Sequence, residues 1–153
     1  MEKQNPSFKV LMADDDDDDC LLVDSAFQEI GISHDLRFVG DGQELLDYLY
    51  NEGEFADPEK NPRPDLILLD LNMPRIDGRE ALTIIKSDSQ LKNIPILIFT
   101  TSREERDIAL SKQAGASSFL SKPEGFQDLA DTLEKFCTAI QHNPNIPFQV
   151  IGC

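Results

Sequence analysis

The chain has 153 residues, 40% of them hydrophobic, which suits a single globular domain with its own core. Its formal net charge of −15, from 29 acidic and 14 basic residues, argues against binding to nucleic-acid phosphates or to anionic membrane surfaces. No apolar segment reaches the ~18 residues of a membrane helix, and no signal-peptide core is present. The three cysteines form no CxxC pair, so we expect a cytoplasmic protein with reduced thiols.

Apolar runs alternate along the chain with segments whose apolar residues recur at helical spacing. In chain order, the pattern predicts a strand followed by a helix five times, at residues 8–13 and 16–30, 34–39 and 41–53, 65–70 and 78–88, 94–100 and 103–113, and 117–121 and 126–140. The apolar run that ends at Asp70 is typical of a central parallel strand. This alternation predicts an α/β domain with a doubly wound, five-stranded parallel sheet and helices on both faces.

Three segments lie outside this alternation. Residues 54–64 contain three prolines and are predicted to form a loop. We expect the domain itself to cover residues 8–141, with terminal extensions at residues 1–7 and 142–153. The second extension contains a small apolar cluster, and we expect it either to be disordered or to pack on a partner.

Polar residues with compatible chemistry follow four of the predicted strands. Aspartates 14–16 end the first strand, Asp70 ends the third, Thr100 ends the fourth and Lys122 follows the fifth. The carboxyl ends of parallel strands meet at one edge of a sheet, where ligands bind. Clustered carboxylates are costly unless a cation neutralises them, and Mg²⁺ is held by one or two carboxylates together with phosphate. The sequence therefore predicts a magnesium site at this edge.

The run of six aspartates at residues 14–19 is predicted to have two parts. Its first residues belong to the site, whereas Asp17–Asp19 open a helix, whose N-terminal dipole favours negative charge. We interpret these last three as a solvated helix start. A calcium-binding EF-hand loop requires glycine at its sixth position and glutamate at its twelfth, and neither register, from Asp14 or from Asp15, supplies them.

Four motifs together resemble the receiver domain of two-component response regulators. They are "ADD", "LILLDLNMPRIDG", "IPILIFTTS" and "AGASSFLSKP", and the resemblance covers residues 8–140. It implies a single-domain, chemotaxis-receiver-like protein with the flavodoxin-like strand order 2-1-3-4-5. The proline-rich loop before "RPDLILLDLNMP" is similar to that of small regulators paired with bacterial and cyanobacterial phytochromes.

The resemblance also implies roles for individual residues. Asp70 is expected to accept a phosphoryl group from a histidine kinase. Mg²⁺ is expected to be held by Asp15, by Asp70 and by the backbone carbonyl of Asn72, with Asp14 beside it and contact through water as an option. Lys122 is expected to pair with the phosphate.

Further residues are implied to transmit the phosphorylation. Thr100 is expected to bind a phosphoryl oxygen and to act with Phe119 as the switch, although Tyr is common at the position of Phe119. The Lys122–Pro123 bond is expected to be cis. A small residue at Ser102, where the family tunes hydrolysis, predicts a short-lived phosphate.

The expected function is a phosphorelay response regulator that signals through the face formed by its fourth helix, fifth strand and fifth helix. Its kinase is expected to be of phytochrome type, its downstream target is an unidentified protein, and a homodimer is an option. It is not expected to be an enzyme beyond its own phosphorylation and dephosphorylation. Two alternatives stay open: a receiver-like module independent of phosphate, and an aspartyl-phosphate phosphatase, which would need an acid where this chain has Asn72.

Overall fold

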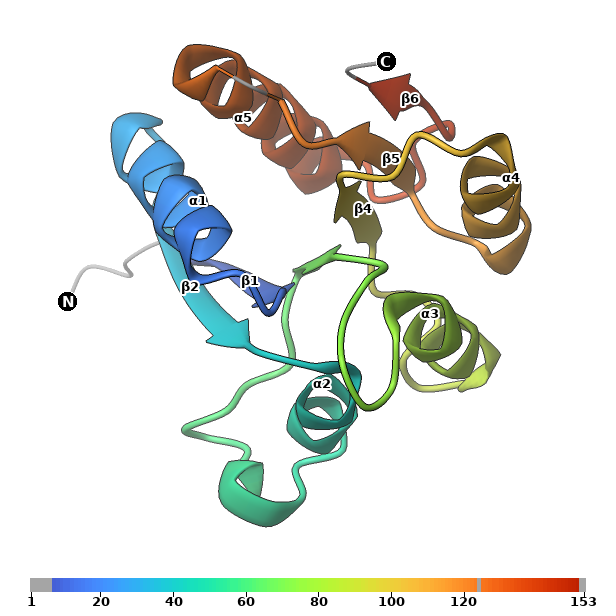
Figure 1. The fold of residues 1–153 in the computed structure, drawn as a ribbon. Helices are drawn as coiled ribbons and strands as arrows, with labels where there is room; N and C mark the ends of the chain where they lie inside the picture. The colour runs from blue at the N-terminus through green and yellow to red at the C-terminus, as the bar shows by residue number, and fades with distance from the viewer. Residues whose placement is uncertain (1–6, 124, 152–153) are drawn as a thin grey trace, which may run out of the picture.

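The computed structural model describes residues 7–123 and 125–151, which form a three-layer α/β fold (Figure 1). Its sheet is parallel throughout, with the strand order β2-β1-β3-β4-β5-β6. The strands are β1 (Phe8–Ala13), β2 (His34–Val39), β3 (Leu66–Leu69), β4 (Ile96–Thr100), β5 (Ser118–Ser121) and β6 (Val150–Ile151). The predicted order of the first five strands is confirmed.

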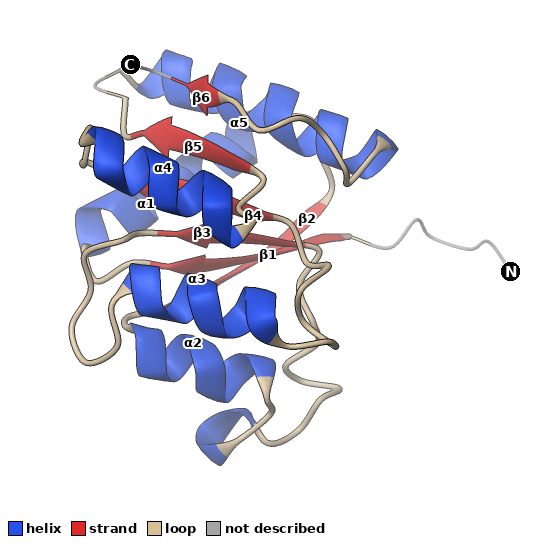
Figure 2. Cartoon of the chain, turned by 90° about the vertical axis from the view of Figure 1, so that its right-hand side faces the viewer, coloured by secondary structure: helices blue, strands red, loops and turns tan. Residues whose placement is uncertain are grey.

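In the described part of the chain, five α-helices connect and cover the strands. They are α1 (Asp17–Glu29), α2 (Gly42–Leu49), α3 (Gly78–Ser87), α4 (Glu105–Ala114) and α5 (Phe126–His142), with a short 3₁₀ turn at Gly53–Phe55. Helices α1 and α5 lie on one face of the sheet, and α2, α3 and α4 lie on the other (Figures 1 and 2). Within residues 7–123 and 125–151, none of the helices is both long and apolar enough to cross a bilayer.

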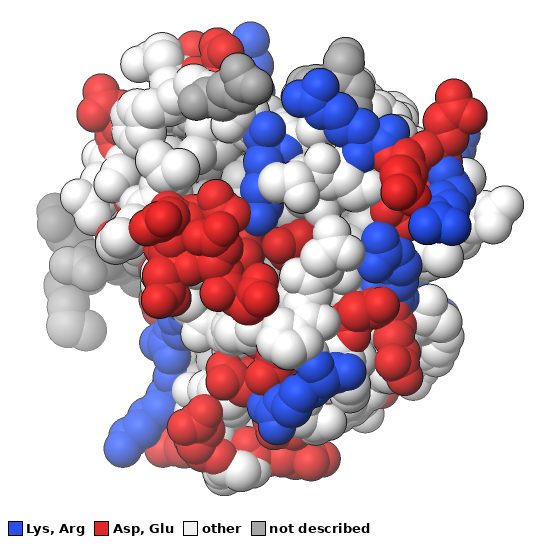
Figure 3. All heavy atoms as spheres, viewed as in Figure 1, with Lys and Arg blue, Asp and Glu red and all other residues white. Residues whose placement is uncertain are grey.

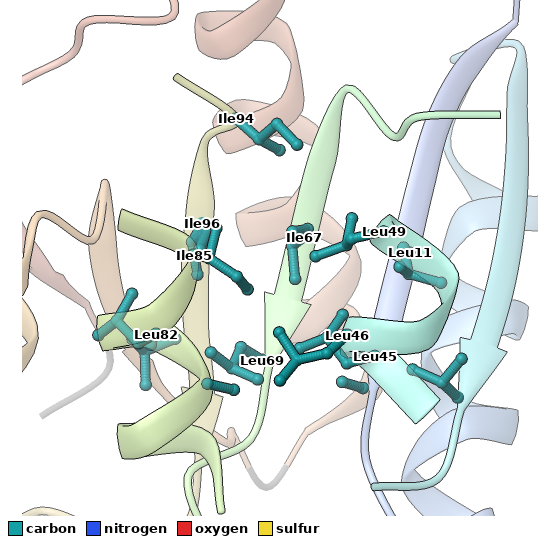
Figure 4. Packing of buried hydrophobic residues seen from close by; sticks show 14 of the residues in the cluster. Leu11, Leu45, Leu46, Leu49, Ile67, Leu69, Leu82, Ile85, Ile94 and Ile96 are labelled. Carbon is teal, nitrogen blue, oxygen red and sulfur yellow. The ribbon is translucent and has the colours of Figure 1, made fainter. Parts of the chain in front are cut away.

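The core consists of two apolar layers, one on each side of the sheet. Alternate residues of the central strands point to opposite faces. On the side of α2 and α3, the layer includes Leu11, Ile67, Leu69 and Ile96 from the strands and Leu45, Leu46, Leu49, Leu82 and Ile85 from the helices (Figure 4). Every residue of β3 and β4 is buried. Burial on both faces explains why these strands read as continuous apolar runs rather than as alternating ones.

A sixth strand is the main difference from the sequence prediction. The segment after α5 turns back and pairs β6 with β5, and the amide of Phe119 donates to the carbonyl of Gln149 at 2.9 Å. Ile146 and Ile151 pack against the α1–α5 layer of the core. The tail therefore packs on its own domain. A strand of two residues is too short to give a period-2 pattern, so the sequence did not reveal it.

Candidate functional site

The strand ends bring the predicted site residues to one edge of the sheet. Asp14 and Asp15 directly follow β1, Asp70 directly follows β3, Thr100 is the last residue of β4, and Lys122 directly follows β5. The parallel strands all point toward this edge (Figure 2). A backbone hydrogen bond from Lys122 N–H to the carbonyl of Thr100, 2.8 Å long, aligns the ends of β4 and β5.

The ammonium group of Lys122 is the centre of the site. Its Nζ lies 2.9 Å from Oδ2 of Asp14, 3.2 Å from Oδ2 of Asp70 and 2.5 Å from Oδ2 of Asp19. It also lies 5.4 Å from the centre of the Phe99 ring. Burial disfavours the charged amine, but the hydrogen bonds to Asp19 and Asp14 outweigh burial and raise the pKa of Lys122. The lysine therefore stays charged at neutral pH.

Asp14 carries a negative charge that its surroundings only partly compensate. Its side chain is fully buried, and its Oδ1 accepts a hydrogen bond of 2.9 Å from the amide of Asp16. Burial raises the pKa of Asp14 to about 6, although its hydrogen bonds to Lys122 and Asp16 act in the opposite direction. One ammonium group is thus insufficient for the carboxylates around it, and a further cation would relieve the remaining repulsion.

The donor set fits a hard divalent cation. Asp14, Asp15 and Asp70 each offer a carboxylate oxygen, and these three oxygens lie within 4.8 Å of one another. Asp15 is exposed, so the cluster is open to solvent. Carboxylate oxygens with water-accessible positions are the coordination that Mg²⁺ requires. Figure 3 shows acidic side chains gathered over the start of α1, beside this edge of the sheet.

Asp19 is a site residue that the sequence interpretation set aside. Asp16 caps α1, because its side chain accepts hydrogen bonds from the amides of Asp18 and Asp19. Asp17 and Asp18 are exposed, as predicted for a solvated helix start. The prediction is wrong for Asp19, whose carboxylate reaches Lys122. No local signal distinguishes Asp19 from Asp17 and Asp18, because its contact with Lys122 joins residues 103 positions apart in the chain.

The two predicted switch residues are buried in this structure. Thr100 is fully buried, and its Oγ1 accepts a hydrogen bond of 3.3 Å from the amide of Ser102. Phe119 is fully buried in the layer that faces α2 to α4. The structure therefore places Thr100 at the site edge and Phe119 in the core next to β4, whose Ile98 is its partner in the strand register.

The Lys122–Pro123 bond differs from the expectation. No peptide bond within residues 7–123 and 125–151 is cis, so this bond is trans. A trans bond before proline is the more stable isomer by ~0.5–1 kcal/mol. Next to this bond, Nε of Arg103 donates to Oγ of Ser121, the last residue of β5, at 3.1 Å.

The loop between β3 and α3 packs tightly behind the carboxylate of Asp70. The amide of Asn72 donates to Oδ1 of Asp70 at 3.3 Å. A Cβ atom at Gly78 would collide with the carbonyl oxygen of Asp70, so only glycine allows α3 to begin here. The sequence pattern predicted a helix that starts at this residue, but the close approach of Gly78 to Asp70 is visible only in the structure.

Comparisons with known proteins agree with this geometry. The pattern of the response regulator receiver domain matches residues 10–134. The response regulator Rcp1 of Synechocystis is 38% identical over 128 residues, which are 84% of this chain and 85% of Rcp1. The crystal structure of the phosphorylated cyanobacterial phytochrome response regulator RcpA is 34% identical with a TM-score of 0.80, covering 91% of this chain and 96% of that one.

A third similar protein structure contains a divalent metal ion. The structure of Rcp1 in its Mn²⁺-bound form is 34% identical with a TM-score of 0.79, and the match covers 93% of this chain and 99% of that chain. The family match spans most of the strands and helices that position the acidic site. Together, the motif match, the parallel sheet and the cluster of aspartates around one lysine mean that this chain belongs to the response regulator receiver domain family.

Proposed function

We propose that this response regulator accepts a phosphoryl group on Asp70 in a Mg²⁺-dependent reaction. The observation that carries the proposal is the position of Lys122, whose Nζ contacts the carboxylates of both Asp70 and Asp14. The exposed carboxylate of Asp15 completes an oxygen-rich cluster with them. An ammonium group and a divalent cation near the same carboxylate would neutralise the charge that an incoming phosphoryl group brings.

The chemical step is a transfer between two side chains. A carboxylate oxygen of Asp70 forms a bond to phosphorus, while the P–N bond of a kinase phosphohistidine breaks. The imidazole nitrogen keeps the electron pair of that bond and takes up a proton. Lys122 offsets the charge on the transferred group. A magnesium ion held by Asp15, Asp70 and the backbone carbonyl of Asn72 would supply further charge neutralisation.

Phosphorylation changes the site through charge and hydrogen bonding. An acyl phosphate brings strong acceptor oxygens and about −1.5 to −2 charge near pH 7. In this structure the hydroxyl of Thr100 accepts a hydrogen bond from the amide of Ser102. After phosphorylation, this hydroxyl is expected to turn toward a phosphoryl oxygen. This movement is expected to alter the packing of Phe119 and thereby the face formed by α4, β5 and α5. That face is the proposed binding surface for a downstream protein.

The proposed partner that supplies the phosphoryl group is a histidine kinase. The similarity to RcpA, described as a phytochrome response regulator, supports a kinase of the phytochrome class. Cys20 and Cys137 are free thiols, which supports action of the domain, residues 8–141, in the cytoplasm.

Acetyl phosphate with Mg²⁺ tests the proposed acceptor directly. Intact-protein mass spectrometry is expected to show one phosphoryl group on the wild type and none on Asp70→Asn. Asp18→Asn is the matched control, because it removes one carboxylate from the same acidic region at an exposed position. Equal incorporation into wild type and Asp70→Asn would remove Asp70 from this role. Phosphoryl incorporation that persists after chelation of all Mg²⁺ would show that the reaction does not require the metal.

A further inference from the structure

An ion pair outside the acidic cluster joins α3 to α4. Nε and Nη2 of Arg79 lie 2.7 Å and 2.9 Å from Oδ1 and Oδ2 of Asp107, so the guanidinium group binds the carboxylate with two parallel hydrogen bonds. The side chain of Asp107 is only 4% exposed. The hydrogen bonds from Arg79 lower the pKa of Asp107, against the effect of burial. Paired in this way, a buried carboxylate keeps its charge.

On one side, this ion pair reaches the loop that follows Asp70. Nη1 of Arg79 lies 3.4 Å from the carbonyl of Leu71 and 3.4 Å from Oδ1 of Asn72. The amide of Asn72 in turn donates to Oδ1 of Asp70. A shift of this loop therefore changes the surroundings of the guanidinium group of Arg79.

On the other side, the ion pair reaches the residues after β4. The hydroxyl of Ser102 donates to Oδ2 of Asp107 at 2.6 Å, and the amide of Ser102 donates to Oγ1 of Thr100. A continuous chain of hydrogen bonds thus runs from Asp70 through Asn72, Arg79, Asp107 and Ser102 to Thr100, as the contacts above show one by one. It links the acceptor and the switch threonine by a route that does not include Phe119.

Helix α4 depends on these polar contacts for its position. Its buried residues are Asp107 and Ser111, both polar, and the hydroxyl of Ser111 donates back to the carbonyl of Asp107. Its N-cap residue, Glu104, makes no side-chain capping bond. Ile108 and Leu110 are only partly buried against the core. A helix held in this way responds to a change in its ion pair more readily than one held by a buried apolar face.

We propose that Arg79 and Asp107 are positioning residues that transmit the state of the acidic site to the start of α4. The inference rests on the proposed function, because it requires the site to take Mg²⁺ and a phosphoryl group. Binding at Asp70 shifts the loop that carries Asn72, and the ion pair passes this shift to α4 without the movement of Phe119.

Hydrogen exchange of the full chain with Mg²⁺ and beryllofluoride, a phosphoryl mimic, tests this coupling. In the wild type, exchange in peptides covering residues 104–110 is expected to change by about five-fold or more, which is the lower end of typical coupling between sites. In Arg79→Gln and Asp107→Asn, that change is expected to fall below about two-fold. The change in exchange at residues 14–20 is expected to persist in both variants, because the acidic cluster itself is intact.

Arg75→Gln is the matched control. Arg75 lies in the loop that carries Asn72 and makes the same kind of two-bond ion pair as Arg79, with Nε 2.9 Å and Nη2 3.1 Å from the carboxylate of Asp41. That pair leads to the start of α2 instead of α4, so the response of α4 is expected to survive. Arg79→Lys, which keeps the charge but not the two parallel bonds, is expected to restore part of the response. Ser102→Ala, which leaves the buried pair intact, is expected to weaken it.

Each outcome decides between the two claims. If the wild type shows no exchange change at residues 14–20 with Mg²⁺ and beryllofluoride, the proposed function fails and the inference fails with it. If these residues respond but α4 does not, or if α4 responds fully in Arg79→Gln and Asp107→Asn, the inference alone is overturned. An equal loss in Arg75→Gln would mean that general loosening of the loop, not this ion pair, accounts for the effect. Should Asp107→Asn fail to fold, Arg79→Lys and Ser102→Ala decide the question.

Discussion

Helices α4 and α5 flank the same strand, β5, but are attached to the domain in different ways. Helix α5 buries six side chains: Leu129, Ala130, Leu133, Phe136, Cys137 and Ile140. Helix α4 buries Asp107 and Ser111 and is fixed by the ion pair to Arg79. Apolar burial is non-directional, whereas a hydrogen-bonded ion pair depends on geometry and on local charge. The position of α5 therefore depends on apolar packing, whereas the position of α4 depends on the charges of Arg79 and Asp107.

The largest expected effect comes from breaking the apolar attachment. Leu133 is fully buried, so Leu133→Ala is expected to lower the free energy of unfolding by about 2–5 kcal/mol. Urea denaturation measures this loss, and Glu134→Ala, an exposed neighbour, is the control with little change. The exchange response of α4 should persist in the folded variant. Loss of that response would mean that α5 also transmits the signal.

A smaller and pH-dependent effect is expected from breaking the polar attachment. Arg79→Gln leaves the buried carboxylate of Asp107 without its charged partner, which is expected to cost about 1–3 kcal/mol at neutral pH. Because the folded-state pKa of Asp107 is lowered, the stability that the pair contributes is present above the unfolded value of about 3.9 and is lost as pH falls through the lowered folded value.

Denaturation of wild type and Arg79→Gln at several pH values measures this dependence. The difference in unfolding free energy is expected to be largest near neutral pH and to shrink as pH falls and Asp107 becomes protonated in both folded proteins. The effect of Leu133→Ala, which involves no titrating group, should not change with pH in this way. A difference for Arg79→Gln that stays constant down to the lowest pH would contradict the assignment of the charge to Asp107.

The smallest predicted effect is the pH dependence of Mg²⁺ affinity that protonation of Asp14 causes. Asp14 has a pKa of about 6 in the folded protein, so it binds a proton as pH falls through that value. Its raised pKa makes its charge unfavourable for folding above about pH 6, a cost that a bound cation would offset. The pKa of Lys122 is raised, so this residue stays charged over the same pH range. It therefore does not alter the direction of the pH dependence that Asp14 causes.

Calorimetric titration with Mg²⁺ measures this effect. Affinity is expected to weaken about ten-fold from pH 7 to pH 5, because only about a tenth of Asp14 is ionised one pH unit below its pKa. In Asp14→Asn, the affinity is expected to depend less on pH over this range. An identical pH dependence in wild type and Asp14→Asn would show that another group controls binding.

The sequence predicted the sheet and the strand ends well, because both follow from local patterns. The strands at residues 8–13 and 34–39 match β1 and β2 to the residue. The apolar runs that end at Asp70 and Thr100 located the edge of the sheet that carries the site. In a parallel sheet the carboxyl ends of all strands lie at the same edge, whatever the side chains are. Lys122 was placed by the same argument and lies among the predicted aspartates.

The features that were missed depend on side chains meeting across elements. Arg79 and Asp107 are 28 residues apart in the chain. Arg and Asp are usually exposed on helices, so the sequence contained no sign that these two form a buried pair. Asp19 was read as solvated because a helix start alone explains an acidic run. The isomer before Pro123 was taken from the resemblance, and the structure has the opposite one.

The strand β6 has a consequence for handling the protein. It covers backbone groups of β5 that would otherwise form the open margin of the sheet. Unpaired strand margins are templates for the addition of foreign chains. Shortening the chain before residue 146, or crowding that end with a bulky fusion partner, would uncover this margin, so an affinity tag is better joined at the opposite terminus.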